Sequence, residues 1–287
     1  MKKLLFLSLL FINYFNFAQE NSAIYVCDFS MAYEGLELLN VQKISTNDGY
    51  NNQPSFASNE ALLYAGNNNG QTDIAEYDLI SKTSKWKNKI TQGSEYSPQK
   101  FPSNNDLAAV RLDKDGLQRL YKYNSEMGNS SDLIENIQVA YFAFYNDKTI
   151  LSTVLNGEKM DLALIDLQKN TTDTLFRNAG RSLQKIPKTQ SMSYSLINDA
   201  GNLDMYMLDM NSFESFFITE LPIGIQDYVW INDTQVIVAS GNKLYLYDTL
   251  GEPDWVQVAS LEEYGLKDIT RLAISPDTKK LALVANK

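Results

Sequence analysis

Short apolar segments alternate with polar turns along almost the whole chain, and one kind of segment occurs six times. Each copy is rich in aliphatic and aromatic residues, and its second-to-last residue is Asp or Asn. The copies are IYVCDF at 24–29, IAEYDL at 74–79, LYKYNS at 120–125, LALIDL at 162–167, MYMLDM at 205–210 and LYLYDT at 244–249. Successive copies begin 39 to 50 residues apart. This is the period of one four-stranded blade of a β-propeller.

Each copy lies in the same local pattern of predicted strands. Two strands separated by a polar turn precede it, as in PSFASNEALLYAG and YFAFYNDKTILSTVL. Asn, Asp and Pro recur in these turns because they suit tight-turn geometry. A short fourth strand follows the copy, as in KWKNKIT at 85–91, DTLFR at 173–177 and SFFITE at 215–220. The pattern therefore predicts four strands per repeat.

The two ends of the chain each carry half of a repeat. The C-terminal end supplies a first strand at 271–275 and a second at 281–285, whereas the N-terminal end starts with a third strand at 23–29 and a fourth at 38–44. Pairing these halves would close a ring and cover apolar faces and strand edges. We therefore predict an all-β, six-bladed β-propeller of four-stranded blades, closed by N-terminal strands pairing with C-terminal strands in one split blade. A seven-bladed ring and a β-sandwich are the alternatives.

One column of the repeat is apolar in all six copies, where Phe56, Phe101, Phe144, Ile186, Trp230 and Ile274 align. A side chain that recurs at one repeat position is expected to fill the space between neighbouring blades. We therefore assign this column to the core of the protein rather than to a binding surface.

The first residues have the layout of a secretory signal peptide. Lys2 and Lys3 precede an apolar run over 4–17, and the small residue Ala18 follows it. A run this short is typical of a signal peptide, because a membrane span needs about 20 apolar residues. We expect a signal peptide at 1–18 and a single propeller domain at 19–287, with an uncleaved anchor as the alternative. The mature chain would be periplasmic or secreted, monomeric and without an integral membrane segment.

Composition narrows the chemistry that this chain can perform. The formal net charge of −10 argues against nucleic acid as a partner, because phosphate backbones would be repelled. The chain has no histidine, which removes Ser-His-Asp and Cys-His catalysis and His-ligated zinc. Its one cysteine, Cys27, has no partner for an internal disulfide and is expected to be a buried apolar residue. We expect no cofactor.

The segment Leu112-Asp113-Lys114-Asp115-Gly116 has the beginning of a calcium-binding loop. It lacks the third alternating oxygen ligand and the distal Glu of that motif, so a hairpin turn with glycine at positive φ is favoured. No phosphate-binding loop, dinucleotide fingerprint or nucleophile elbow occurs in the sequence. We therefore predict no metal site and no catalytic residue.

Candidate binding residues follow from the fold. In a propeller the first strand of each blade lines the central channel, and its entry loop forms one mouth of the channel. The residues at this position are Gln53, Gln99, Tyr141, Gln184, Asp227 and Arg271. A ring of this kind could hold a small polar ligand through hydrogen bonds. The alternative is that these side chains bond to loop backbones and channel water.

The blade pattern resembles that of the TolB-like six-bladed propellers, which carry WD40-like (PD40) repeats. That family's repeat runs roughly P-x-F-S-P-D-G-K, an aromatic strand and then I-Y-x-x-D. PSFASNEALLYAG with DIAEYDL, and RLAISPDTKKLALVA, match it. TolB itself carries an N-terminal α/β domain, which we do not expect here because the first strand follows the signal peptide closely. The chain is more similar to free-standing secreted propellers of this family, which have histidines where this chain has Phe142 and Gln184.

The resemblance and the residues together suggest an exported, non-catalytic propeller. It would bind a protein partner or a small polar ligand in the bacterial envelope, as the TolB-like family implies. The alternative is a hydrolase or lyase that acts on a carbohydrate or small polar substrate. Such an enzyme would use carboxylate, tyrosine or arginine side chains at the channel mouth.

Overall fold

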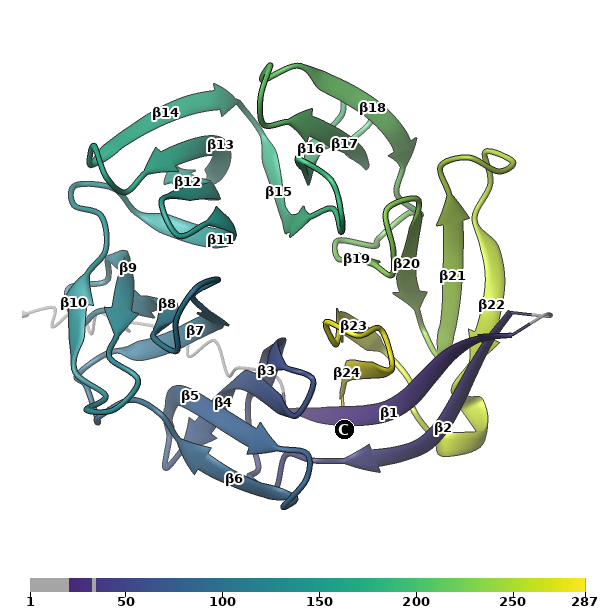
Figure 1. Ribbon diagram of the computed structural model, residues 1–287, viewed down its shortest axis with the longest axis horizontal. Helices are drawn as coiled ribbons and strands as arrows, with labels where there is room; N and C mark the ends of the chain where they lie inside the picture. Colours follow the sequence, from purple (N-terminus) through teal and green to yellow (C-terminus); the bar gives the residue numbers. More distant parts are fainter. Residues whose placement is uncertain (1–20, 33–34, 287) are drawn as a thin grey trace, which may run out of the picture.

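The computed structural model describes residues 21–32 and 35–286, which form six four-stranded antiparallel sheets arranged in a ring (Figure 1). Blade 1 comprises β3 (Asn51–Ser58), β4 (Ala61–Asn68), β5 (Gln71–Asp78) and β6 (Thr83–Trp86). Blade 2 comprises β7 (Ser94–Lys100), β8 (Leu107–Leu112), β9 (Gln118–Tyr123) and β10 (Ser130–Asp132). Blade 3 comprises β11 (Val139–Asn146), β12 (Thr149–Asn156), β13 (Lys159–Asp166) and β14 (Thr171–Phe176).

The remaining blades complete the ring. Blade 4 comprises β15 (Ala179–Lys185), β16 (Ser191–Ile197), β17 (Leu203–Asp209) and β18 (Ser215–Glu220). Blade 5 comprises β19 (Val229–Trp230), β20 (Gln235–Ser240), β21 (Lys243–Asp248) and β22 (Val256–Ser260), followed by the short 3-10 helix η1 (Glu262–Tyr264). Blade 6 comprises β23 (Ile269–Ile274), β24 (Lys280–Asn286), β1 (Ser22–Ala32) and β2 (Gly35–Lys43). The first strand of each blade faces the axis of the ring (Figure 1).

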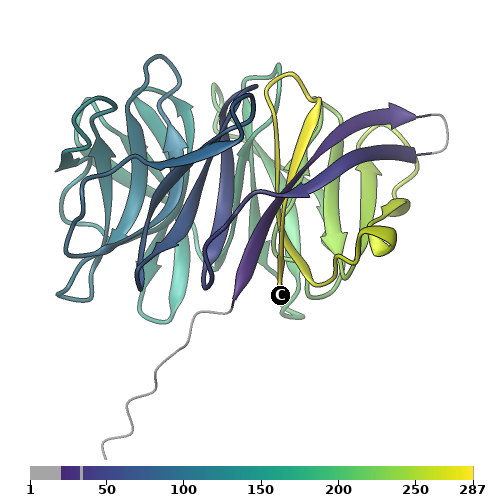
Figure 2. The same cartoon turned by 90° about the horizontal axis from the view of Figure 1, so that it is seen from below.

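Blade 6 is the split blade that the sequence predicts. Its strand order is β2-β1-β24-β23, so the two ends of the chain pair side by side in one sheet. Ser22 lies opposite Asn286, and Asp28 lies opposite Lys280, in the antiparallel register of β1 and β24 (Figure 2). Leu281 and Leu283 of β24 are completely buried. The predicted fold class and ring closure are therefore confirmed.

The apolar core is divided among the interfaces between blades, where the repeated column packs. The rings of Phe101 in blade 2 and Phe144 in blade 3 lie 4.7 Å apart between centroids. Ile186 of blade 4 packs in one cluster with Trp230 of blade 5. Phe101, Phe144, Ile186 and Trp230 are buried, which confirms the assignment to the core for these four, whereas Phe56 and Ile274 are half-buried against inter-blade clusters.

The predicted fourth strand over 85–91 is wrong in its second half, since β6 ends at Trp86. Beyond it the chain turns across to blade 2, where the Lys89 N–H donates to the Gly128 carbonyl. The buried Asn88 supports this crossing by accepting the Ile74 N–H at 2.9 Å and donating to Asp73 at 3.0 Å. The Asn88 side chain thus accepts the backbone hydrogen bond that a continued fourth strand would have accepted.

The loop at 112–116 is a hairpin turn, as predicted. Gly116 has a φ of +83°, and the Asp113 N–H donates to the Leu117 carbonyl at 3.0 Å. The carboxylate of Asp113 is shared by Arg111 and Arg119, at 2.5 and 2.7 Å. Within residues 21–32 and 35–286, no cluster of three or more His, Cys, Asp or Glu could hold a metal ion. Cys27 is buried, as expected.

The predicted signal peptide at 1–18 lies outside the residues that the structure describes. Across the described ranges, no helix has the length and apolar character needed to cross a membrane.

Glu95 in β7 gives the stability of the fold a pH dependence. Its side chain is buried, and its Oε1 accepts hydrogen bonds from Thr91 and Tyr123 at 2.7 and 3.1 Å. Burial raises the pKa of Glu95 from 4.5 to about 8. Between these values the folded protein holds a proton that the unfolded chain has released, so stability falls as the pH rises.

We expect the free energy of unfolding to fall by up to about 1.4 kcal/mol per pH unit between pH 5 and pH 8 because of this group. Glu95→Gln should flatten that slope, whereas Glu60→Gln at an exposed turn should leave it intact. Urea unfolding at four pH values measures both. An equal slope in wild type and Glu95→Gln would contradict the assignment.

Candidate functional site

The inner strands depart from regular pairing where they approach the axis. Register shifts interrupt β3 between Asn52 and Ser55, β7 between Tyr96 and Gln99, and β15 between Ala179 and Leu183. Two residues inside these shifts, Gln53 and Ser97, have positive φ values of 55° and 49°. Such bulges bend a strand and redirect its side chains. They decide which residues reach the channel.

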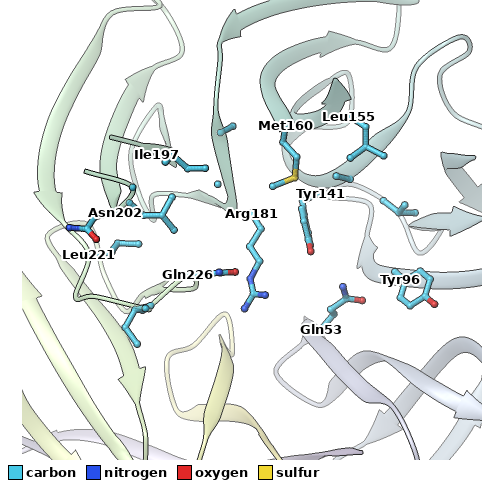
Figure 3. A pocket seen from close by; sticks show the side chains of 18 of the residues that line it. Gln53, Tyr96, Tyr141, Leu155, Met160, Arg181, Ile197, Asn202, Leu221 and Gln226 are labelled. Carbon is cyan, nitrogen blue, oxygen red and sulfur yellow. The ribbon is translucent and has the colours of Figure 1, made fainter. Parts of the chain in front are cut away.

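A cavity of about 620 Å³ opens at one mouth of the channel. It lies beneath the ends of strands in blades 2, 3 and 4 and beneath the connection 221–226 between β18 and β19. Polar and apolar groups contribute about equally to its wall. Figure 3 shows how the side chains converge on the channel. The apolar residues of the wall include Val110, Leu112, Leu155, Met160, Ile197, Leu203, Leu221, Ile223 and Ile225.

Arg181, which lines this cavity, belongs to a charged cluster that extends into the neighbouring narrow section of the channel. Arg181 Nε donates to Asp227 Oδ2 at 2.7 Å, and Arg181 Nη2 donates to the same oxygen. Arg271 Nη1 donates to Asp227 Oδ1 at 3.1 Å. Its guanidinium also lies over the ring of Tyr141, 5.5 Å from the centroid. The exposed fractions of the three charged side chains are 26% for Arg181, 15% for Arg271 and 11% for Asp227.

The cluster carries more positive than negative charge. Burial alone would lower the pKa of Arg271, but the Asp227 carboxylate and the neighbouring tyrosines raise it overall. Burial raises the pKa of Tyr50, whose ring meets the edge of Tyr96 at 5.9 Å between centroids. Tyr50 is therefore a neutral hydrogen-bonding group at neutral pH. Two guanidiniums and one carboxylate leave one net positive charge in the cluster.

The structure brings all six sequence-predicted residues to one narrow section of the channel, a space of about 100 Å³ that Gln53, Gln99, Tyr141, Gln184, Asp227 and Arg271 line together with Arg181. They have different environments. Gln99 donates to the Phe142 carbonyl at 2.6 Å and Gln184 to the Tyr228 carbonyl at 3.3 Å, so each connects its blade to the next. Gln53 accepts the Ser97 N–H at 2.8 Å. All three glutamines thus bond to the backbone of the next blade, which is the alternative stated above.

Sequence reasoning missed Arg181, Tyr50 and the apolar wall as parts of the site. Arg181 was overlooked because it lies in the bulge of β15, where 179–183 spans only 194–196 of β16. A signal was nevertheless present in the spacing. Arg181, Asp227 and Arg271 are 46 and 44 residues apart, about one repeat each. Three successive blades thus supply two bases and one acid.

These features define a six-bladed propeller with a ligand-sized cavity at one channel mouth. No family model matches the chain, and no curated protein matches it. Solved structures share the fold. A putative TolB from Agrobacterium tumefaciens superposes with a TM-score of 0.69 at 12% identity, over 93% of this chain and 99% of that one. TolB from Acinetobacter baumannii gives 0.61 at 11% identity, over 93% of this chain and 64% of that one.

The same architecture also occurs in an enzyme. Oligogalacturonate lyase from Vibrio parahaemolyticus superposes with a TM-score of 0.58 at 11% identity, covering 91% of each chain. At such identities the likeness shows the fold alone. The protein is thus a TolB-like six-bladed propeller in architecture, and its function has to be argued from its own cavity.

Proposed function

We propose that this protein is an exported, non-catalytic propeller that binds a small ligand in the cavity at the channel mouth. The observation that carries this proposal is the cavity of about 620 Å³, which is lined by aliphatic side chains and by Arg181 of the Arg181–Asp227–Arg271 cluster. A concave, mostly apolar space with a few convergent polar groups is the usual form of a small-molecule site.

The charged residues favour binding over catalysis. Among the described residues that line the cavity and the channel, Asp227 is the single acid. Both of its oxygens accept hydrogen bonds from guanidinium groups, which hold the carboxylate in place and occupy its acceptor positions. A hydrolase or lyase would need a base that can take up a proton from the substrate. The fold likeness to oligogalacturonate lyase is the observation that favours this alternative.

The location outside the cytoplasm is part of the proposal and rests on the predicted signal peptide at 1–18. The mass of the protein recovered from the envelope fraction tests it, since the mature chain is expected to begin at Gln19.

Binding in the cavity can be tested with N-phenyl-1-naphthylamine, a neutral apolar dye that fluoresces when it leaves water. We expect the wild-type protein to enhance its fluorescence in a saturable, one-site manner. Leu155→Asp should weaken dye binding at least tenfold, because it places a charge on the apolar wall. The matched control is Leu250→Asp at an exposed turn of blade 5, which should bind the dye like wild type. Equal binding by Leu155→Asp, or no binding by wild type, would refute the proposal.

A further inference from the structure

The charged cluster that joins the cavity to the channel has a charge opposite to that of the protein as a whole. The chain carries a formal net charge of −10, yet the buried cluster holds two guanidiniums against one carboxylate. A buried cation without a full counter-charge is costly, so proteins usually pair it. No other acid among the described residues lines these cavities to balance the second guanidinium. The site is therefore one negative charge short of neutrality.

We propose that the ligand is an amphipathic carboxylate, a molecule with one carboxylate on an apolar body. This inference rests on the function proposed above and adds the chemical class of the ligand. One bound carboxylate would neutralise the cluster. A cation would be repelled, and a doubly charged phosphate would overcompensate the single positive charge.

The geometry at the base of the cavity suits a carboxylate head. Arg181 donates hydrogen bonds from Nε and Nη2 to Asp227, and its Nη1 has no hydrogen-bond partner among the described residues. In Figure 3 the Arg181 guanidinium, the Tyr141 hydroxyl and the Gln53 carboxamide point toward one region of the channel. All three side chains line the cavity. Guanidinium donors match carboxylate oxygens closely, and such charged hydrogen bonds are stronger than neutral ones.

The wall above this base suits an apolar body. Leu155 and Met160 lie on one side of the cavity and Ile197 and Leu221 on another, all set back from the Arg181 guanidinium (Figure 3). A ligand with its head at Arg181 would therefore place its body against aliphatic side chains. The volume of about 620 Å³ lies within the range of small-molecule sites, roughly 300 to 1,000 Å³.

Three ligands with the same ten-carbon chain test the head group by displacement of N-phenyl-1-naphthylamine from the full mature chain. They are decanoate, 1-decanol and decyltrimethylammonium. We expect decanoate to bind at least tenfold more tightly than 1-decanol, and the cation to bind more weakly than either. Raising the salt concentration should weaken the binding of decanoate and leave the binding of 1-decanol unchanged, because salt screens charge.

Arg181→Gln should abolish the preference for decanoate and leave the affinity for 1-decanol within about twofold. The matched control is Arg177→Gln, since Arg177 is exposed and lies outside the cavity lining. If Arg181→Gln does not fold, the head-group series and the salt dependence in wild type decide the question. Equal displacement by decanoate and 1-decanol would overturn the carboxylate assignment but leave the binding function intact. Absence of dye binding by wild type would instead refute the binding function itself.

Discussion

Deleting residues 271–287 is expected to unfold the whole protein rather than to trim one blade. The deletion removes most of β23 and all of β24, so β1 loses its partner along 22–28. It also removes Leu272, Leu281, Leu283 and Val284, which are buried in two inter-blade clusters. Removing a large buried aliphatic side chain costs about 2–5 kcal/mol, so four approach the total stability of about 5–15 kcal/mol. We expect the truncated chain to lose its near-ultraviolet circular dichroism.

A circular permutant distinguishes the effect of losing the pairing of β1 with β24 from the effect of changing where the chain begins and ends. Ser22 and Asn286 are paired neighbours, so a short linker can join them, and new ends can be opened at the exposed turn of Gly157. This permutant keeps every strand and should unfold cooperatively near the wild-type urea midpoint. A truncated chain that remained folded and soluble would show that blade 6 is not the closure of the ring.

Replacing Asp227 with alanine should cost about 3–5 kcal/mol of stability, because breaking a buried ion pair leaves its partner without a counter-charge. Here two guanidiniums, those of Arg181 and Arg271, would lose their shared acceptor and face each other across the channel. Asp227→Asn should cost less, because the amide keeps one oxygen as an acceptor. In urea denaturation, the midpoint of Asp227→Asn should be lower than that of wild type, and the midpoint of Asp227→Ala should be lower still.

An exposed ion pair provides the contrast. Lys169 pairs with Asp166 on the outer edge of blade 3, and its side chain is 77% exposed. Lys169→Ala should leave the midpoint unchanged, because exposed pairs contribute little. An Asp227→Ala midpoint equal to that of wild type would mean that the cluster does not support the ring. It would also weaken the argument for an anionic ligand, which depends on the same buried charges.

The candidate site was only partly predictable from the repeat. Gln53, Tyr141, Asp227 and Arg271 follow from aligning the first strands, and the structure places them together. Gln99 and Gln184 reach the same section, and the amides of all three glutamines bond to the backbone of the next blade. Arg181 escaped the alignment because a bulge in β15 changes which residues face the axis. A two-residue period cannot reveal such a shift, since the extra residues leave the flanking pattern intact.

The sequence by itself determined the number of blades, the four strands of each and the closure by the two chain ends. Apolar alternation and turn residues are local properties that recur with every repeat, so they can be read without coordinates. Only the tertiary structure decided the end of β6, the pairing of Arg181 and Arg271 on Asp227, and the apolar cavity above them. The cluster and the cavity depend on side chains from different blades meeting at one point, and the end of β6 depends on the buried Asn88 and a backbone bond to blade 2. The distance between such residues is set by bulges and inter-blade packing, which no local pattern along the chain encodes.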